Sequence, residues 1–328
     1  MFDLCAGFVY SQVLAACVRL KLFEVLHEAP ASEAALAARC GLAPEAMNRL
    51  LVAAESLRLV RQRADGAWAL GELGAAMIGN PGIAAMVEHH AMLYADLADP
   101  VELLRRERGG TALAQYWAYA GAEQPEALPG EKVADYTALM AASQPMVAQE
   151  VLAAYRFGPH RRLMDVGGGT GAFLAAVGAA YPALQLDLFD LPVVLHGAGA
   201  RLGAAGLANR VSLHPGSFRD DPLPLGADAI SLVRVLYDHA DATVAGLLAA
   251  VHAALPPKGR LIVSEPMSGG AVPDRTTDVY FAVYTLAMQT GRTRSGAEIA
   301  SLMAASGYVN IKIQQGFRPF VTSIVTGE

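Results

Sequence analysis

The sequence predicts an α/β protein: a Rossmann-like sheet of seven strands, ending in a β-hairpin, preceded by a mainly helical N-terminal domain. The first observation is the apolar run Leu163–Val166, which meets four glycines within five residues and continues as a helix-compatible segment. The second is a strand-like run about 25 residues later that ends in Asp190, where nucleoside-binding α/β folds place an acid. The third is the end of the chain, where the runs Val309–Ile313 and Phe320–Val325 flank a short turn and predict a hairpin.

The composition limits the class of protein. A chain of 328 residues suits two domains, and its net charge of -6 argues against nucleic acid as a general partner. The mean hydropathy of +0.32 owes much to alanine. The most apolar helical stretch, 242–255, is shorter than the roughly 18 residues of a membrane span, and no secretion signal is evident. Three cysteines lack metal-ligand spacing, so we expect reduced thiols in a cytoplasmic protein.

The N-terminal segment is expected to fold as a winged helix. Its patterns predict three helices and then a hairpin, over residues 8–26, 32–42, 44–56 and 59–70. Such a unit often binds DNA, but the candidate recognition helix 44–56 carries only Arg49 as a base, beside Glu45 and Glu55. We therefore expect a protein–protein role, with the apolar first helix as a dimerisation surface.

Two further helices are predicted before the α/β half. Residues 83–104 form a helix containing His89 and His90, and adjacent helical residues do not face each other, so a metal pair is not expected there. Residues 135–155 form a long helix that bears Met140.

From residue 156 the α/β pattern is regular. The strand candidates are 163–166, 186–189, 211–214, 229–235 and 261–264. In open α/β sheets, ligands bind beyond the carboxyl ends of the strands. This rule selects the segments 167–171, 190–191, 216–218, 234–239 and 265–267.

The glycine turn alone does not identify the ligand. Gly167, Gly169 and Ala172 also satisfy the relaxed dinucleotide pattern, which leaves a nicotinamide enzyme open. A nicotinamide domain is expected to continue with helical crossovers, whereas this chain ends in a hairpin. Strand–helix units followed by a β-hairpin look like the class I S-adenosylmethionine-dependent methyltransferase fold.

Several motifs resemble one family. The turn LMDVGGGTG, the FDLP of 189–192, the PGSF of 215–218 and the LYDH of 236–239 are similar to the small-molecule O-methyltransferases of plants and bacteria. The resemblance covers nearly the whole chain, and segments 2–26 and 234–239 are most similar to bacterial carotenoid hydroxyl O-methyltransferases. It implies a homodimer and three parts: a dimerisation domain (1–104), a linker with helices lining the active site (105–155) and an S-adenosylmethionine-binding domain (156–328).

The resemblance also implies S-adenosylmethionine as the methyl donor. The residues expected around it are Asp165, Gly167, Gly169, Gly171, Asp190, Leu191, Ser217, Phe218 and Arg234. The glycines would pass under the methionine part and Asp190 would bind the ribose hydroxyls. Leu191 and Phe218 would flank the adenine. Ser217 stands where the family often has an acid, which implies a weaker polar contact to adenine.

The catalytic base departs from the family pattern. The family typically reads His-Asp-Trp after the fourth strand, whereas this chain reads Tyr237-Asp238-His239. Three assignments stay open: His239 reaches the acceptor, Tyr237 acts or orients through its hydroxyl, or neither is a base and alignment supplies most of the acceleration. Glu265 matches the family's glutamate that orients the histidine.

The acceptor pocket is expected to be apolar. Its candidate residues are Met140, Tyr280, Phe281, Tyr284 and Met288. The family's second glutamate would fall at Thr293, so that charge is absent. Few polar groups among aromatic and methionine side chains favour a long apolar acceptor such as a hydroxylated carotenoid.

The sequence thus predicts a cytoplasmic, homodimeric O-methyltransferase without a metal. Its acceptor is an apolar small molecule, and contact with a membrane is at most transient. Other acceptors stay open: a phenolic or polyketide hydroxyl, or a carbon atom of a bacteriochlorophyllide. A rival from another class is a winged-helix regulator that only senses S-adenosylmethionine.

Overall fold

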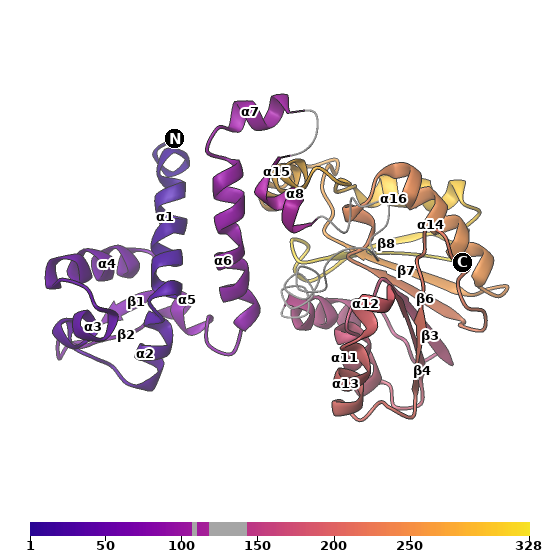
Figure 1. Cartoon of the computed structure of the whole chain (residues 1–328), viewed down its shortest axis with the longest axis horizontal. Coiled ribbons are helices and arrows are strands. Elements are labelled where there is room, and N and C mark those ends of the chain that lie inside the picture. Colours follow the sequence, from indigo (N-terminus) through magenta and orange to yellow (C-terminus); the bar gives the residue numbers. More distant parts are fainter. Residues whose placement is uncertain (107–109, 118–142) are drawn as a thin grey trace. The chain divides into compact units, whose positions relative to one another are not determined.

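The computed structural model describes residues 1–106, 110–117 and 143–328. Their contacts divide the chain into two compact units, Met1–Met92 and Leu93–Glu328 (Figure 1). The boundary that we placed at residue 104 falls inside the second unit. Met140 lies outside the described residues, as does the first part of the predicted helix 135–155; residues 143–154 are helical.

The first unit contains the helices and the hairpin of a winged helix. Its elements are α1 (Phe2–Arg19), α2 (Leu22–Glu28), α3 (Glu33–Cys40), α4 (Pro44–Ser56), β1 (Val60–Gln62), β2 (Trp68–Leu70), α5 (Glu72–Ala75) and the first part of α6 (Pro81–Asp96). Ser32 caps α3 and Gly41 ends it at φ 66°, as the sequence predicts. A single helix over 8–26 is wrong. Lys21 takes a left-handed conformation (φ 54°), so α2 turns Leu22 and Phe23 into the core.

Helix α1 is the exposed apolar element of this unit. Phe2, Leu4 and Phe8 are exposed, and few residues of the helix are buried. With 18 residues and a hydropathy of 1.2, it is the one helix in the described parts of the chain that is long and apolar enough to cross a membrane. The stretch 242–255 forms a shorter apolar helix, Asp241–Ala254, as expected.

The second unit is built on a seven-stranded sheet of order β5-β4-β3-β6-β7-β9-β8. The strands are β3 (Arg162–Val166), β4 (Gln185–Asp190), β5 (Val211–Pro215), β6 (Ala229–Val233), β7 (Arg260–Glu265), β8 (Lys312–Gln315) and β9 (Ser323–Gly327). Strands β3 to β7 pair in parallel, and β9 is antiparallel to both β7 and β8. The predicted sheet with its terminal hairpin is confirmed.

Helices cover both faces of this sheet (Figure 1). In all, the second unit contains α7 (Pro100–Arg105), α8 (Ala112–Tyr116), α11 (Ala172–Ala180), α12 (Pro192–Leu195), α13 (Ala198–Ala204), α14 (Asp241–Ala254), α15 (Tyr280–Met288) and α16 (Gly296–Ala305), with the short helical turns η2 (Leu236–Asp238) and η3 (Arg275–Val279). One apolar core contains side chains of α11 and α13, and the other those of α14 and α16. The predicted helix 83–104 is interrupted, because Asp99 caps α7 and Pro100 starts it.

The topology fixes where a ligand can bind. From β3 the chain proceeds outward to β4 and β5, then returns to place β6 on the other side of β3. The carboxyl ends of β3 and β6 therefore form a topological switch point, the usual ligand crevice of such sheets. Strand β6 ends at Val233, two residues earlier than predicted, because Arg234 turns to φ 58° and starts the loop.

Candidate active site

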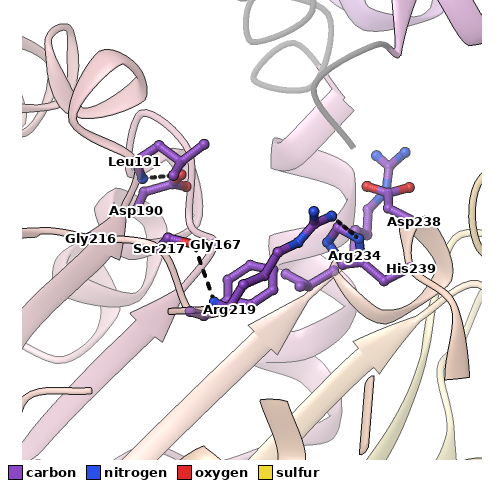
Figure 2. Close-up of a pocket in the computed structure, with 11 residues that line it drawn as sticks. Gly167, Asp190, Leu191, Gly216, Ser217, Arg219, Arg234, Asp238 and His239 are labelled. Atoms are coloured by element: carbon purple, nitrogen blue, oxygen red, sulfur yellow. Dashed lines mark hydrogen bonds between the residues drawn. The ribbon is translucent and has the colours of Figure 1, made fainter. Parts of the chain in front are cut away.

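A pocket opens at this switch point (Figure 2). Its lining comes from the carboxyl ends of four strands and consists of Gly167, Asp190, Leu191, Gly216, Ser217, Phe218, Arg219, Arg234, Val235, Asp238 and His239. Six of the residues predicted for the cofactor are in this lining. The strand-end rule selected the segment 234–239, which includes Val235, but its segment 216–218 ends one residue before Arg219.

The glycine turn is shaped by close contacts. Gly167, Gly169 and Gly171 all have positive φ values, of 72°, 62° and 76°. A Cβ on Gly168 would lie 2.3 Å from Asp165 Oδ2, so the backbone passes directly over that carboxyl group. No atom lies within 4 Å of a Cβ built on Gly169. The turn therefore brings bare backbone to the pocket, although only Gly167 of these glycines belongs to the lining.

Asp190 is held in place by backbone donors. The N–H of Gly169 donates to Oδ2 and that of Leu191 donates to Oδ1, both at 2.7 Å. Burial raises the pKa of this carboxyl to about 6. Each oxygen keeps a second lone pair, so the carboxylate can still accept hydrogen bonds from ligand hydroxyls.

Asp165 lies beneath the pocket and not in it. Its carboxyl group is buried and accepts a hydrogen bond from Ser231 Oγ at 2.6 Å, while Oδ2 has no partner. Burial raises its pKa to about 7. The expected direct contact with the cofactor is therefore not supported, because the glycine backbone covers this group.

The loop after β5 is stabilised by its own acids. Ser217 donates from its N–H to Asp221 Oδ2 at 2.8 Å and from its hydroxyl to Asp220 Oδ2 at 3.1 Å. These carboxylates act as loop caps, and nowhere in the described ranges do three potential metal ligands cluster.

His239 faces the loop after β5. Its ring packs edge-on against Phe218 with 5.3 Å between centroids, and Arg219 Nη2 lies 3.4 Å from Nδ1. Figure 2 shows the Arg219 side chain reaching across the pocket to this ring. An arginine can only donate, so Nδ1 is the acceptor and the ring proton sits on Nε2. Burial, Arg219 and Arg294 lower the pKa of His239 to about 4. This histidine is a poor candidate for the base.

The Tyr237 side chain is buried beside Arg234 and Phe281. It is 2 % exposed, its ring lies 6.4 Å from that of Phe281 in α15, and Arg234 Nη2 donates to its hydroxyl at 3.4 Å. It is not part of the pocket lining. Asp238, in contrast, belongs to the pocket lining. It is 3 % exposed, and its Oδ1 has no hydrogen-bond partner.

Glu265 holds the backbone of the turn η2. Its Oε1 accepts the N–H groups of Val235 and Leu236 at 2.8 and 2.7 Å, and its Oε2 accepts that of Tyr237 at 3.4 Å. The expectation that Glu265 orients the histidine is thus not met, because the carboxylate is occupied by backbone donors. Burial raises its pKa to about 7.

The four described candidates for the acceptor pocket all lie on α15, outside the lining of this pocket. Tyr284 and Met288 are buried, and Trp117 Nε1 donates to the Tyr284 hydroxyl at 3.1 Å. The Tyr280 ring stacks on that of Tyr284 at 5.5 Å. Tyr284 and Met288 are thus packed inside the protein and do not line the described pocket.

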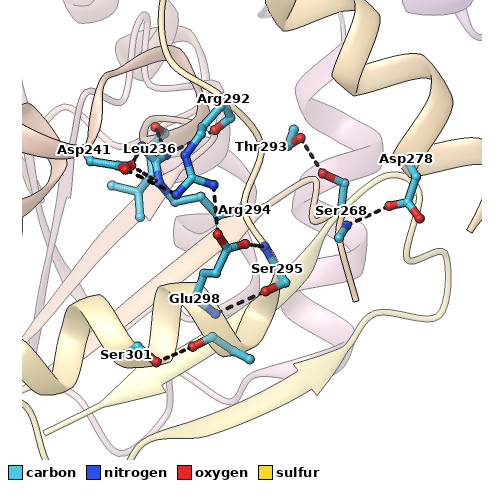
Figure 3. A network of polar contacts seen from close by, with 12 residues as sticks. Leu236, Asp241, Ser268, Asp278, Arg292, Thr293, Arg294, Ser295, Glu298 and Ser301 are labelled. Atoms are coloured by element: carbon cyan, nitrogen blue, oxygen red, sulfur yellow. Dashed lines mark hydrogen bonds and ion pairs between the residues drawn. The ribbon is translucent and has the colours of Figure 1, made fainter. Parts of the chain in front are cut away.

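A buried arginine that sequence reasoning missed stabilises the turn η2 (Figure 3). Arg294 is 2 % exposed and donates to the carbonyl oxygens of Leu236 and His239 at 2.8 and 2.9 Å. It also bonds Asp241 Oδ1 at 2.6 and 2.9 Å. These contacts join segments more than fifty residues apart, and a local pattern carries no signal for them.

The buried carboxyl groups predict a pH-dependent stability. The pKa values of Asp165 and Glu265 lie near 7 in the folded protein, above those of an unfolded chain, so their stabilising contribution is complete below about pH 4 and is lost as the pH rises through 7. His239 has a lowered pKa, so its contribution is already complete above about pH 6.5. We expect the free energy of unfolding of the ligand-free protein, measured with urea, to fall between about pH 6.5 and 8. Asp165→Asn should make this decline shallower. A free energy of unfolding that rises over the same pH range would contradict the raised pKa values of the two buried carboxyl groups.

Two family models match the chain. One describes an O-methyltransferase dimerisation domain, at residues 2–80, and the other an O-methyltransferase domain, at residues 94–309. The chain therefore belongs to the O-methyltransferase family. Membership confirms the predicted enzyme class and, because the family depends on S-adenosylmethionine, the predicted cofactor.

Two relatives match over nearly the whole chain. The demethylspheroidene O-methyltransferase of Cereibacter sphaeroides is 55 % identical over 99 % of this chain and 86 % of its own length. That of Rhodobacter capsulatus is 48 % identical over 100 % of this chain and 81 % of its own. A solved methyltransferase of calicheamicin biosynthesis, in its SAH-bound form, is 26 % identical with a TM-score of 0.83 over 99 % of this chain and 96 % of that one. The predicted fold and family resemblance are confirmed.

Proposed function

We propose that the protein transfers the methyl group of S-adenosylmethionine to the hydroxyl group of an acyclic, hydroxylated carotenoid. The observation that carries the proposal is the near full-length identity to two demethylspheroidene O-methyltransferases. The switch-point pocket supports it, because an acid and a glycine turn converge there. A phenolic hydroxyl and a bacteriochlorophyllide carbon remain the alternative acceptors.

The pocket residues fit the donor. Asp190 would bind the ribose hydroxyls through oxygens already aligned by Gly169 and Leu191. Leu191 and Phe218 would flank the adenine, and Gly167 would leave room for the methionine part. S-adenosylmethionine supplies a methyl group on a positively charged sulfur, which leaves as a neutral thioether. The protein then has to align the acceptor oxygen and take its proton.

An apolar acceptor suits the neighbouring residues. Thr293, at the position of the family's second glutamate, is buried and shares a hydrogen bond with the Ser268 hydroxyl. Tyr280 and Phe281 add half-buried aromatic surface near Tyr237. A neutral, largely aromatic wall favours a polyene over an acceptor with several polar groups.

The test is transfer of a radiolabelled methyl group to three acceptors in detergent: a hydroxylated acyclic carotenoid, a catechol and a bacteriochlorophyllide. We expect labelled carotenoid as the main product. Labelled catechol or chlorophyllide with unlabelled carotenoid would overturn the acceptor, while retaining the donor.

The geometry also predicts that His239 is not the base. We expect His239→Ala to keep the rate of methyl transfer at saturating donor within about tenfold, since loss of a general base typically costs 10²-fold or more. The dissociation constant for S-adenosylmethionine should rise, because the contacts with Phe218 and Arg219 are lost. A fall of about 10²-fold in rate with unchanged donor affinity would restore His239 as the base.

We further propose that two copies associate through the N-terminal helices. The match of residues 2–80 to a dimerisation domain supports this, as does the exposed apolar face of α1. A cytoplasmic location, with transient membrane contact to collect an apolar acceptor, belongs to the same proposal.

A further inference from the structure

Asp238 is the unusual group of the pocket. It is 3 % exposed, yet it belongs to the pocket lining, and its Oδ1 has no hydrogen-bond partner. A buried carboxyl oxygen without a partner is costly, and such groups persist mainly where function requires them. The turn η2 fixes its position, because Glu265 holds the N–H groups of this turn and Arg294 holds two carbonyl oxygens.

The other candidates in this part of the site are engaged. The Nδ1 of His239 faces Arg219, and both oxygens of Glu265 accept backbone N–H groups. Tyr237 lies outside the lining, with its hydroxyl accepting from Arg234. We propose that Asp238, through its unpartnered Oδ1, accepts the proton from the acceptor hydroxyl group. This inference rests on the proposed function and names the base for that same reaction.

The acceptor O–H bond breaks and its proton goes to the Asp238 carboxylate. The oxygen forms a bond to the methyl carbon as the carbon–sulfur bond breaks, and the electron pair of that bond neutralises the sulfur. The products are a methyl ether, a thioether and protonated Asp238, which later returns its proton to solvent.

The charged surroundings of Asp238 explain how the carboxylate becomes available. Burial and Glu265 raise the pKa of Asp238 well above its usual range, against the smaller opposing effects of Arg234 and Tyr237. Tyr284, also close by, is neutral, because burial raises its pKa. These surroundings favour the protonated form of Asp238. A positively charged sulfonium close to the carboxyl group would favour its ionised form, so binding of the donor should expel that proton.

Calorimetry tests this without turnover. The heat of binding is measured near pH 7 in buffers of different ionisation enthalpy, for S-adenosylmethionine and for S-adenosylhomocysteine, which lacks the positive charge. We expect the donor to release up to about one proton more than the product, and Asp238→Asn, which keeps the volume but cannot ionise, to abolish the difference. An equal difference in both proteins would overturn the proposal. Because no acceptor is present, this result does not depend on the acceptor's identity.

Kinetics gives the second readout. We expect Asp238→Asn to lower the rate of transfer at saturating donor by roughly 10²-fold or more, with a nearly unchanged dissociation constant for S-adenosylhomocysteine. Tyr237→Phe, which retains the carboxyl group, should lose less than about tenfold. Equal losses in the two variants would overturn direct transfer to Asp238. Failure of the wild type to methylate carotenoid would instead count against the proposed acceptor, and the comparison would be repeated on the acceptor that is methylated.

Discussion

Arg294→Gln is expected to lower the free energy of unfolding by about 3 kcal/mol, because it removes charge-assisted hydrogen bonds from two buried carbonyl groups. Those carbonyls belong to Leu236 and His239, which flank Tyr237 and Asp238 in the turn at the pocket. A glutamine is shorter and has two amide donors against five in the guanidinium group, so it cannot reach Asp241 and both carbonyls together. The turn should therefore loosen, and methyl transfer should fall more than donor binding.

Arg292 provides the matched control. It pairs with Asp241 and Glu298 at 3.2 and 2.9 Å, but its side chain is 46 % exposed and it donates to no carbonyl of the turn in the contacts described here (Figure 3). Surface pairs contribute about 0–1 kcal/mol, so Arg292→Gln should change little. Denaturant unfolding and steady-state rates of the two variants test whether Arg294 contributes more to stability and activity than Arg292 does. Equal losses of stability and rate in the two variants would mean that the positive charge near Asp241 stabilises the turn and that the hydrogen bonds to its carbonyl groups do not.

The second large effect is expected for Gly291→Ala. Gly291 has a φ of 55°, and a Cβ there would lie 2.2 Å from the Tyr237 carbonyl oxygen and 2.4 Å from the carbonyl carbon of Asp238. These are backbone atoms and cannot move aside by a change of rotamer. We expect a loss of several kcal/mol in the free energy of unfolding, or a displaced turn with a large loss of activity.

Gly206→Ala is the control for backbone strain alone. Gly206 has a φ of 74°, and nothing lies within 4 Å of a Cβ built on it. An alanine in a left-handed conformation costs roughly 1–2 kcal/mol, so this variant should be mildly destabilised and fully active. If Gly291→Ala and Gly206→Ala lose the same free energy of unfolding and keep the same activity, the close approach of Gly291 to the turn is not needed for stability or activity.

The sequence predicts those parts of the fold that local chemistry determines. Alternating and apolar runs locate the strands, Ser32 and Gly41 mark the ends of one helix, and Asp190 is the last residue of β4, where a ribose-binding acid is expected. Left-handed conformations at Lys21 and Arg234 escape such reasoning, because neither residue type favours them and only tertiary packing imposes them.

The same limit explains the errors within the site. Sequence position places Tyr237, Asp238 and His239 together, but the direction of each side chain depends on the turn η2. Glu265 and Arg294 hold that turn from strands and loops distant in the chain. Family likeness suggested that Glu265 orients a histidine. The contacts show that it binds backbone, because the acid needs donors and the three N–H groups of the turn supply them.

The exposed apolar face of α1 links the stability of the protein to its concentration in the cell. If the exposed side chains of Phe2, Leu4 and Phe8 are covered only by a second copy, folding and association are coupled. Each tenfold dilution would then remove about 1.4 kcal/mol of stability per dimer. We expect the midpoint of thermal unfolding to rise with protein concentration, and a constant midpoint would exclude the coupling. The amount of working enzyme would thus increase more steeply than the rate of synthesis, so a weakly expressed gene would yield disproportionately little activity.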